Sequence, residues 1–123
     1  MLTRDAVPGV QVTLNLIVNA EEAMRGAEPR ILTVRTNRST AGTVRVSIED
    51  SGPGIGESDR VRIFDPLFTT KAGGMGMGLS ICRSIVENHG GKIWVEAAAA
   101  RGAVFQFELP ATRVHMEPQG LAA

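Results

Sequence analysis

The stretch from residue 43 to residue 56 constrains the fold most, because an alternating strand runs directly into a glycine-rich loop. Val44, Val46 and Ile48 alternate with polar or charged residues, which predicts a strand with one core face and one solvent face. By the same parity, the side chain of Asp50 points toward the core. A carboxylate in that position needs hydrogen-bond donors, because an unpaired buried charge is very costly.

Three glycines follow Asp50 at alternate positions: Gly52, Gly54 and Gly56. Without Cβ atoms they would allow a flat base to approach, and the exocyclic amine of adenine is one donor that Asp50 could accept from. The alternative is an Asx-turn, in which Asp50 accepts a hydrogen bond from the backbone of Gly52. The pattern by itself leaves both interpretations open.

The rest of the chain predicts an α+β fold, a two-layer sandwich with helices on one face of the sheet. Apolar residues recur at helical spacing over residues 10–25 and 78–88, which predicts two helices. Alternating residues predict two hairpins. The expected strands cover residues 31–38, 43–50, 92–98 and 103–109. A short helix over 57–63, a long mobile loop over 65–77 and a flexible tail over 111–123 complete the organisation.

Asn15 and Asn19 are four residues apart in the first helix, so their side chains share one face. A carboxamide oxygen is a suitable ligand for Mg²⁺, which prefers oxygen and takes much of its shell from water and phosphates. The alternative for a single helical Asn is a hydrogen bond to neighbouring backbone. Two at this spacing favour a metal site.

Gly74, Gly76 and Gly78 lead into a helix that begins near Leu79. Free N–H groups and the positive end of the helix dipole favour phosphate at such a point. Lys71 could add a positive charge, although a loop lysine is usually just solvated. The alternative for the glycines is an ordinary flexible loop before a helix. Phe64 and Phe68 are expected to anchor the two ends of the long loop in the core.

Composition and charge limit the function classes. The 123 residues form one domain, expected over residues 1–110, and 13 basic residues balance 13 acidic ones. This balance argues against a nucleic-acid partner or direct membrane contact. The single Cys82 rules out an internal disulfide and fits a reducing cytoplasm. The chain has no apolar run of the ~20 residues that a membrane span needs, and no secretion signal is visible.

Four segments in fixed order resemble the ATP-binding catalytic domain of bacterial sensor histidine kinases, in the group shared with gyrase, Hsp90 and MutL. The segments are 15–24, 50–56, 64–68 and 74–79, and the similarity extends from about residue 10 to 110. The sequence after residue 79 resembles the nitrogen-regulation and oxygen-sensor subclass. The resemblance implies a Bergerat-type fold, in which helices cover a mixed sheet and ATP lies between the helices and a mobile lid.

The resemblance also implies residue roles. Asn19 would be the main Mg²⁺ ligand, Asn15 would support the metal and phosphates, and Asp50 would bond the adenine amine. Asn15, Asn19 and Lys71 would carry the catalytic roles. The remaining nucleotide-binding positions would be Gly52, Gly54, Ile55, Gly56, Phe64, Thr70, Lys71, Gly74, Gly76, Met77, Gly78 and Leu79.

The implied reaction is transfer of the γ-phosphoryl group of Mg-ATP to a histidine on a separate dimerisation domain, which in turn serves a response regulator. In hydrolysing relatives a Glu stands four residues before the metal-binding Asn and acts as general base; here that residue is Asn15, which cannot take the proton. The alternatives are a nucleotide-binding module without catalysis and a hydrolysing ATPase of the same group.

Three departures from the family pattern carry further expectations. A phosphoacceptor His-Glu pair is absent from the 123 residues, so the chain should not phosphorylate itself alone. The family's N-terminal strand is expected to be missing, and the vacated position invites strand-mediated pairing into a homo-oligomer. Ala103 replaces a frequent Thr, which should weaken nucleotide affinity. The lid over residues 65–77 is expected to lack order without nucleotide.

Overall fold

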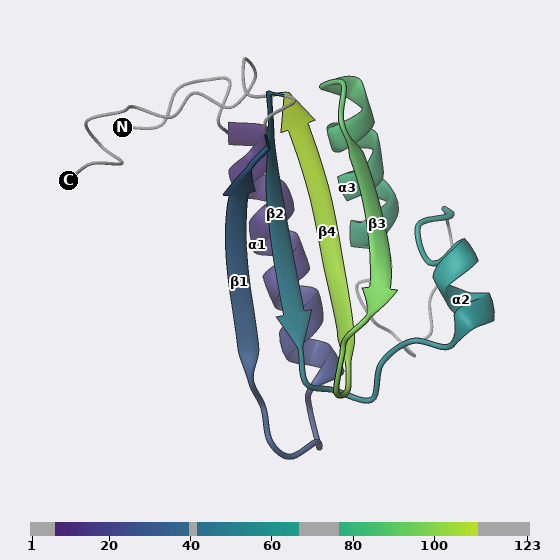
Figure 1. Ribbon diagram of the computed structural model, residues 1–123. Helices are drawn as coiled ribbons and strands as arrows, with labels where there is room; N and C mark the ends of the chain where they lie inside the picture. The colour runs from purple at the N-terminus through teal and green to yellow at the C-terminus, as the bar shows by residue number, and fades with distance from the viewer. Residues whose placement is uncertain (1–6, 40–41, 67–76, 111–123) are drawn as a thin grey trace.

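The computed structural model describes residues 7–39, 42–66 and 77–110. Three helices and four strands follow one another in the order helix, two strands, two helices, two strands (Figure 1). Their bounds are α1 Val7–Ala23, β1 Leu32–Arg38, β2 Thr43–Asp50, α2 Glu57–Arg62, α3 Met77–Asn88, β3 Lys92–Ala97 and β4 Ala103–Pro110. These elements confirm the predicted α+β organisation.

The sheet has the strand order β1-β2-β4-β3, so the second strand of each predicted hairpin lies in the centre. All three pairings between the described strands are antiparallel. This corrects the mixed sheet that the resemblance implied, as far as the described strands go. The physical reason is that two hairpins meet through β2 and β4, which run in opposite directions and pair Ile48 with Phe105.

The core lies between the sheet and the two long helices, which both cover the same sheet face (Figure 1). Val12, Leu16 and Ala20 recur every four residues along α1 and are buried, as the helical pattern predicts. They pack in one cluster with Phe105 and Phe107 of β4. The central strands therefore hold both helices in fixed positions, and the site described below lies where these helices meet.

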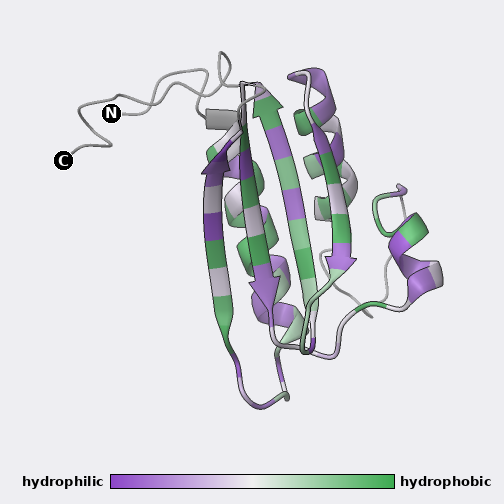
Figure 2. Ribbon diagram, in the orientation of Figure 1, coloured by the Kyte–Doolittle hydropathy of each residue, from purple (hydrophilic) through white to green (hydrophobic). Residues whose placement is uncertain are grey.

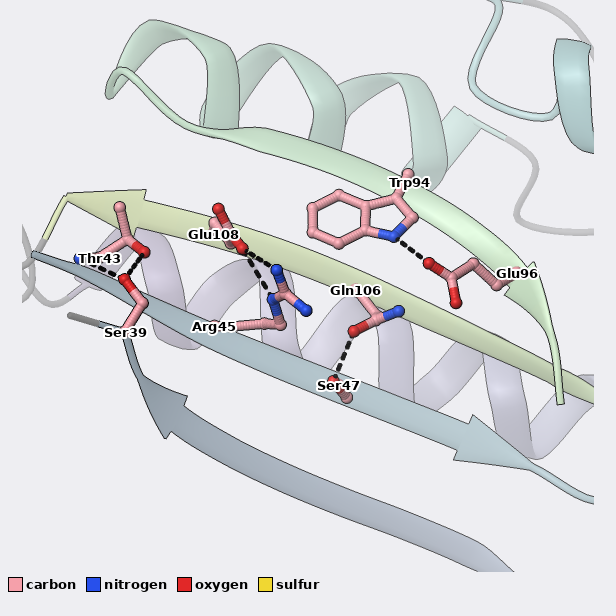
Figure 3. Close-up of polar contacts among 8 residues, drawn as sticks. All are labelled: Ser39, Thr43, Arg45, Ser47, Trp94, Glu96, Gln106 and Glu108. Atoms are coloured by element: carbon pink, nitrogen blue, oxygen red, sulfur yellow. Dashed lines mark hydrogen bonds and ion pairs between the residues drawn. The ribbon is translucent and has the colours of Figure 1, made fainter. Parts of the chain in front are cut away.

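None of the described helices covers the opposite sheet face, and hydrophilic and hydrophobic residues alternate along the strands (Figure 2). Ser47 donates a hydrogen bond to Gln106 across β2 and β4 at 3.0 Å, and both side chains are buried (Figure 3). Arg45 forms an ion pair with Glu108 and also lies over the Trp94 ring, 5.2 Å from its centroid. Long side chains therefore cover this polar face.

Strand β1 forms an edge of the sheet, with β2 as its partner on one side. Leu32 and Val34 on β1 remain 38% and 45% exposed, because the two helices pack over the other strands. Within the described residues, none of the helices has both the length and the apolar character needed to cross a membrane.

Candidate functional site

An open pocket of about 100 Å³ lies where α1 meets the first turn of α3. The residues that line it are Asn15, Val18, Asn19, Gly78 and Leu79. The structure thus brings together two predicted segments that are about 60 residues apart in the sequence. The volume that these residues enclose is smaller than that of a usual cofactor site, which is roughly 300–1,000 Å³. Residues 67–76, which the sequence assigns to the same site, lie outside the described residues.

Asn15 and Asn19 lie on the side of α1 that faces α3, and both are half-buried. Their spacing of one helical turn places both carboxamides at the same pocket, as predicted. Among the described residues, no cluster of three or more His, Cys, Asp and Glu side chains could hold a metal ion. The donor set fits Mg²⁺, since amide oxygens would combine with phosphate oxygens and water.

Asp50 ends β2 with its side chain directed inward, and it is only 2% exposed. Its Oδ1 accepts a hydrogen bond from the backbone amide of Gly52 at 2.9 Å. The Asx-turn that the sequence left open is therefore present. It does not exclude an adenine contact, because a carboxylate can accept several hydrogen bonds at once.

Glycines surround Asp50 on several sides. A Cβ atom on Gly102 would lie 2.0 Å from the Asp50 carbonyl oxygen and 3.0 Å from Oδ1. A Cβ atom on Gly52 would lie 2.8 Å from the carbonyl oxygen of Ala23 in α1. Gly52 therefore permits a close approach, as the sequence predicts for this loop. The group that approaches Gly52 in the structure is the end of α1, whereas the sequence analysis considered a flat base. Sequence reasoning missed Gly102, because its contact with Asp50 is long-range.

Two arginines hold the loop after β2 from outside. Arg101, in the turn between β3 and β4, donates through Nε to the carbonyl oxygen of Gly52 at 3.2 Å. Arg60, in α2, donates to the carbonyl oxygen of Ile55 at 3.1 Å. The side chain of Ile55 packs against the core. Sequence reasoning missed both arginines, since an arginine in a turn or a short helix carries no periodic signal.

Phe64 precedes the long loop and is buried. Its ring meets Phe105 of β4 edge-on, with centroids 6.1 Å apart. It therefore anchors the start of the loop in the core, as the sequence predicts. Phe68, Thr70, Lys71, Gly74 and Gly76 lie outside the described residues, as does most of the expected lid. Met77 begins α3.

Cys82 lies one turn after Gly78 on α3 and is fully buried. It belongs to the core cluster that α1 and α3 share. Burial raises the pKa of the Cys82 thiol. The thiol is therefore neutral at physiological pH and lies behind the pocket wall.

Comparison with known proteins gives a consistent result. Residues 4–113 match the family described as histidine kinase-, DNA gyrase B- and HSP90-like ATPase. The sensor protein TdiS of Thauera aromatica is 46% identical over 103 residues, which cover 81% of this chain and 19% of TdiS. The sensor protein FixL of Bradyrhizobium diazoefficiens is 42% identical over 111 residues, which cover 90% of this chain and 22% of FixL. The chain thus spans about a fifth of the length of these curated relatives.

Solved structures show the same fold. The nucleotide-free catalytic domain of the histidine kinase ThkA superposes with a TM-score of 0.74 at 45% identity, covering 85% of this chain and 67% of that domain. Full-length ShkA in complex with AMPPNP gives a TM-score of 0.68 at 33% identity, covering 81% of this chain and 20% of ShkA.

Proposed function

Because the chain belongs to the family of histidine kinase-, DNA gyrase B- and HSP90-like ATPases, we propose that it binds Mg-ATP and donates the γ-phosphoryl group to a histidine on a separate dimerisation domain. The observation that carries this proposal is the shared pocket of Asn15, Asn19 and the first turn of α3. In this scheme a response regulator would receive the phosphoryl group indirectly, through that histidine. The ThkA relative has been solved in complex with the response regulator TrrA, which supports the scheme.

The phosphate end of the nucleotide would lie at the beginning of α3. N–H groups in the first turn of a helix lack intrahelical partners, and the helix dipole favours negative charge there. Gly78 and Leu79 belong to this first turn and line the pocket. Asn19 and Asn15 would supply oxygen ligands from the facing helix. Bound Mg²⁺ would neutralise charge on the phosphates.

The adenine end would lie at the loop after β2. The Asp50 carboxylate would accept a hydrogen bond from the adenine amine, while the glycines at 52, 54 and 56 and the side chain of Ile55 shape the surrounding wall. Asp50 is held rigidly for this task, since it lies on a central strand and its turn is closed by Gly52. The roles of Thr70, Lys71, Gly74, Gly76 and Met77 in closing over the triphosphate stay predictions.

Phosphoryl transfer is favoured over hydrolysis by the chemistry of Asn15. A hydrolysing site needs a general base to accept a proton from water, and a carboxamide cannot accept it. Transfer to a histidine makes no such demand, because positioning and charge neutralisation supply most of the catalysis. Asn15 lies in the pocket wall, where the hydrolysing relatives would need the base.

The acceptor domain would dock on the other side of α3. An open groove of about 550 Å³ runs there between α3 and the segment that begins with Phe64. Ile81 in the groove is 43% exposed, and Pro66 offers a second apolar contact. Arg83 and Asp65 form an ion pair of 3.8 Å at its rim. A helix that docks in this groove would place its histidine next to the phosphate end of the pocket.

We also propose strand-mediated self-association through β1, which lies at an edge of the described sheet. Among the described strands, β1 has a partner on one side alone, and Leu32 and Val34 are partly exposed. Concentration-dependent mass by analytical ultracentrifugation, lost in Val34→Lys, would support it, and a monomer at high concentration would contradict it. We also propose a cytoplasmic location, where ATP is available and a free thiol stays reduced.

Calorimetric titration of Mg-ATP into the chain and into Asp50→Asn tests the nucleotide site. Asn keeps an oxygen for the Gly52 amide but replaces a charged acceptor, so affinity should fall at least about tenfold. Glu49→Gln is the matched control, since Glu49 precedes Asp50 and pairs with Arg35 on the strand. Absence of binding by a folded wild-type chain would overturn the proposal.

Transfer is tested by mixing the chain with labelled ATP and a dimerisation domain that carries a phosphoacceptor histidine. Acid-labile, alkali-stable label on that domain is the expected product. Ile81→Glu should abolish transfer while leaving Mg-ATP affinity unchanged, because Ile81 lies outside the nucleotide pocket. Release of inorganic phosphate without labelled protein would favour the hydrolysing alternative.

A further inference from the structure

The hydroxyl group of Ser51 joins two loops that lie far apart in the sequence. Ser51 stands between Asp50 and Gly52 and is half-buried. Its Oγ accepts a hydrogen bond from the backbone amide of Ile31 at 2.8 Å. The same hydroxyl donates to the carbonyl oxygen of Pro29 at 2.7 Å. One side chain therefore ties the loop after β2 to the segment that connects α1 with β1.

The loop that contains Ser51 also lies against the end of α1, since β2 and α1 end side by side (Figure 1). The Ser51 Oγ is 3.5 Å from the sulfur of Met24, which follows α1 and is buried. A Cβ atom on Gly52 would lie 2.8 Å from the carbonyl oxygen of Ala23, the last residue of α1. The two residues after Asp50 therefore pack directly against this end of the helix.

The end of α1 belongs to the same row of residues as the predicted metal ligands. Asn15, Asn19 and Ala23 follow one another at intervals of four residues, so they lie along one side of the helix. The two asparagines line the pocket at the phosphate end, whereas Ala23 lies against Gly52 at the base end. Helix α1 therefore spans the distance between the two ends of the proposed nucleotide site.

We propose that Ser51 is a positioning residue, which fixes the loop of Asp50 against the end of α1 and thereby sets the distance between the adenine site and the metal site. This inference rests on the proposed function, because it assigns the two ends to one nucleotide. Ser51 acts through Asp50 and Gly52, since its own hydroxyl is engaged by Ile31 and Pro29. A ligand that occupies both ends needs this distance to match its length, but a ligand of the phosphate end alone does not.

The competing explanation is that Ser51 only stabilises the fold, by closing the connection between α1 and β1. Ser51→Ala removes both hydrogen bonds, whereas Ser51→Thr keeps a hydroxyl that can form them. A role in folding alone predicts the same loss of affinity for every ligand, because only the folded fraction changes. Positioning predicts a loss that is confined to ligands that reach the base end.

Ser39→Ala is the matched control, because Ser39 has a similar role at the other end of the same pair of strands. Its Oγ accepts a hydrogen bond from the backbone amide of Thr43 at 3.2 Å, and the two hydroxyl oxygens are 2.6 Å apart (Figure 3). In the register of β1 and β2, this contact lies at the end away from Asp50. The control therefore removes the same chemical group from the same hairpin without touching the proposed site.

The first readout is amide hydrogen exchange, which needs no nucleotide. The Gly52 amide donates to Asp50 Oδ1, so its exchange reports how firmly the loop is held and not merely whether Ser51 keeps its own partners. Positioning predicts that Gly52 exchanges at least about fivefold faster in Ser51→Ala. Its rate should stay at the wild-type value in Ser51→Thr and Ser39→Ala. An unchanged rate in Ser51→Ala would overturn the proposal, even if the chain binds no nucleotide.

The second readout is calorimetric titration with two ligands, Mg-ATP and the magnesium complex of inorganic triphosphate, which has no base. Ser51→Ala should weaken Mg-ATP binding about three- to tenfold and leave the affinity for triphosphate unchanged. Ser51→Thr should restore Mg-ATP binding, and Ser39→Ala should change neither affinity. Equal losses for both ligands, or unchanged Mg-ATP affinity in Ser51→Ala, would refute the role. If wild type binds neither ligand, the proposed function fails, and the exchange of Gly52 alone decides whether Ser51 holds the loop.

Discussion

Arg101 donates through Nε to the carbonyl oxygen of Gly52, so a residue between β3 and β4 holds the loop that follows β2. Gly52 in turn donates its amide to Asp50 at 2.9 Å. The proposed adenine contact thus depends on a chain of two hydrogen bonds that begins in a different hairpin. The side chain at its outer end is exposed, and its loss should act on binding more than on folding.

Arg101→Ala should therefore weaken Mg-ATP binding about two- to fivefold, because the loop loses one of its outside supports. Arg25→Ala is the control, since Arg25 forms an exposed ion pair with Glu21, and such pairs contribute little. Titration calorimetry on the two variants measures the difference. Equal affinities would show that the loop keeps its shape without Arg101.

Gly102→Ala should destabilise the fold by at least about 3 kcal/mol, through backbone strain and the clash with Asp50. Gly102 has φ of 100°, and an added Cβ would lie 2.0 Å from the Asp50 carbonyl oxygen. Gly42→Ala measures the cost of backbone strain by itself, because Gly42 has φ of 85° and no atom of the described residues lies within 4 Å of an added Cβ. Gly42→Ala should lower the free energy of unfolding by about 1 kcal/mol. Urea unfolding measures both, and similar losses would contradict the clash.

The pair Ser47 and Gln106 should affect stability alone. Removing either side chain leaves a buried polar partner, which costs about 1–3 kcal/mol. The double variant Ser47→Ala, Gln106→Ala should cost less than the sum of the single variants, because no orphaned group remains. Mg-ATP affinity should not change, since the pair lies on the sheet face away from the helices. Additive losses in urea unfolding would show that the two side chains do not interact.

Stability at alkaline pH should depend on Cys82. Burial raises the thiol pKa in the folded state, so the unfolded chain releases its proton at a lower pH than the folded chain does. The contribution of the protonated Cys82 thiol to stability is fully present below the unfolded pKa of about 8.5. It is lost as the pH rises through the folded pKa. The free energy of unfolding should thus fall more steeply above pH 9 in wild type than in Cys82→Ala. Parallel curves from urea unfolding at several pH values would contradict this.

The sequence predicted the local features of the site well. Asn15 and Asn19 share a pocket because helical spacing alone puts them on one face. The inward direction of Asp50 follows from strand parity, and burial confirms it. Alternation also predicted all four described strands to within a residue or two. Each of these features depends on neighbours along the chain, and a single sequence records such neighbours.

Long-range contacts could not be predicted in the same way. The approach of Gly102 to Asp50 arises from the pairing of β2 with β4, and a single sequence does not show which strands pair in the centre. Cys82 looked like one more apolar residue of a helix face, and its complete burial depends on how α1 and α3 pack together. The antiparallel sheet likewise corrected an expectation taken from resemblance alone.

The strand order β1-β2-β4-β3 has a consequence for the growing chain on the ribosome. Asp50 and both asparagines are synthesised early, but β4 and the turn before it are among the last described residues to emerge. Until then β2 pairs with β1 alone, and Gly102 does not yet pack against the Asp50 carbonyl. Domains generally fold as units during synthesis. A nascent chain should thus stay unable to capture nucleotide until translation of this domain is nearly complete.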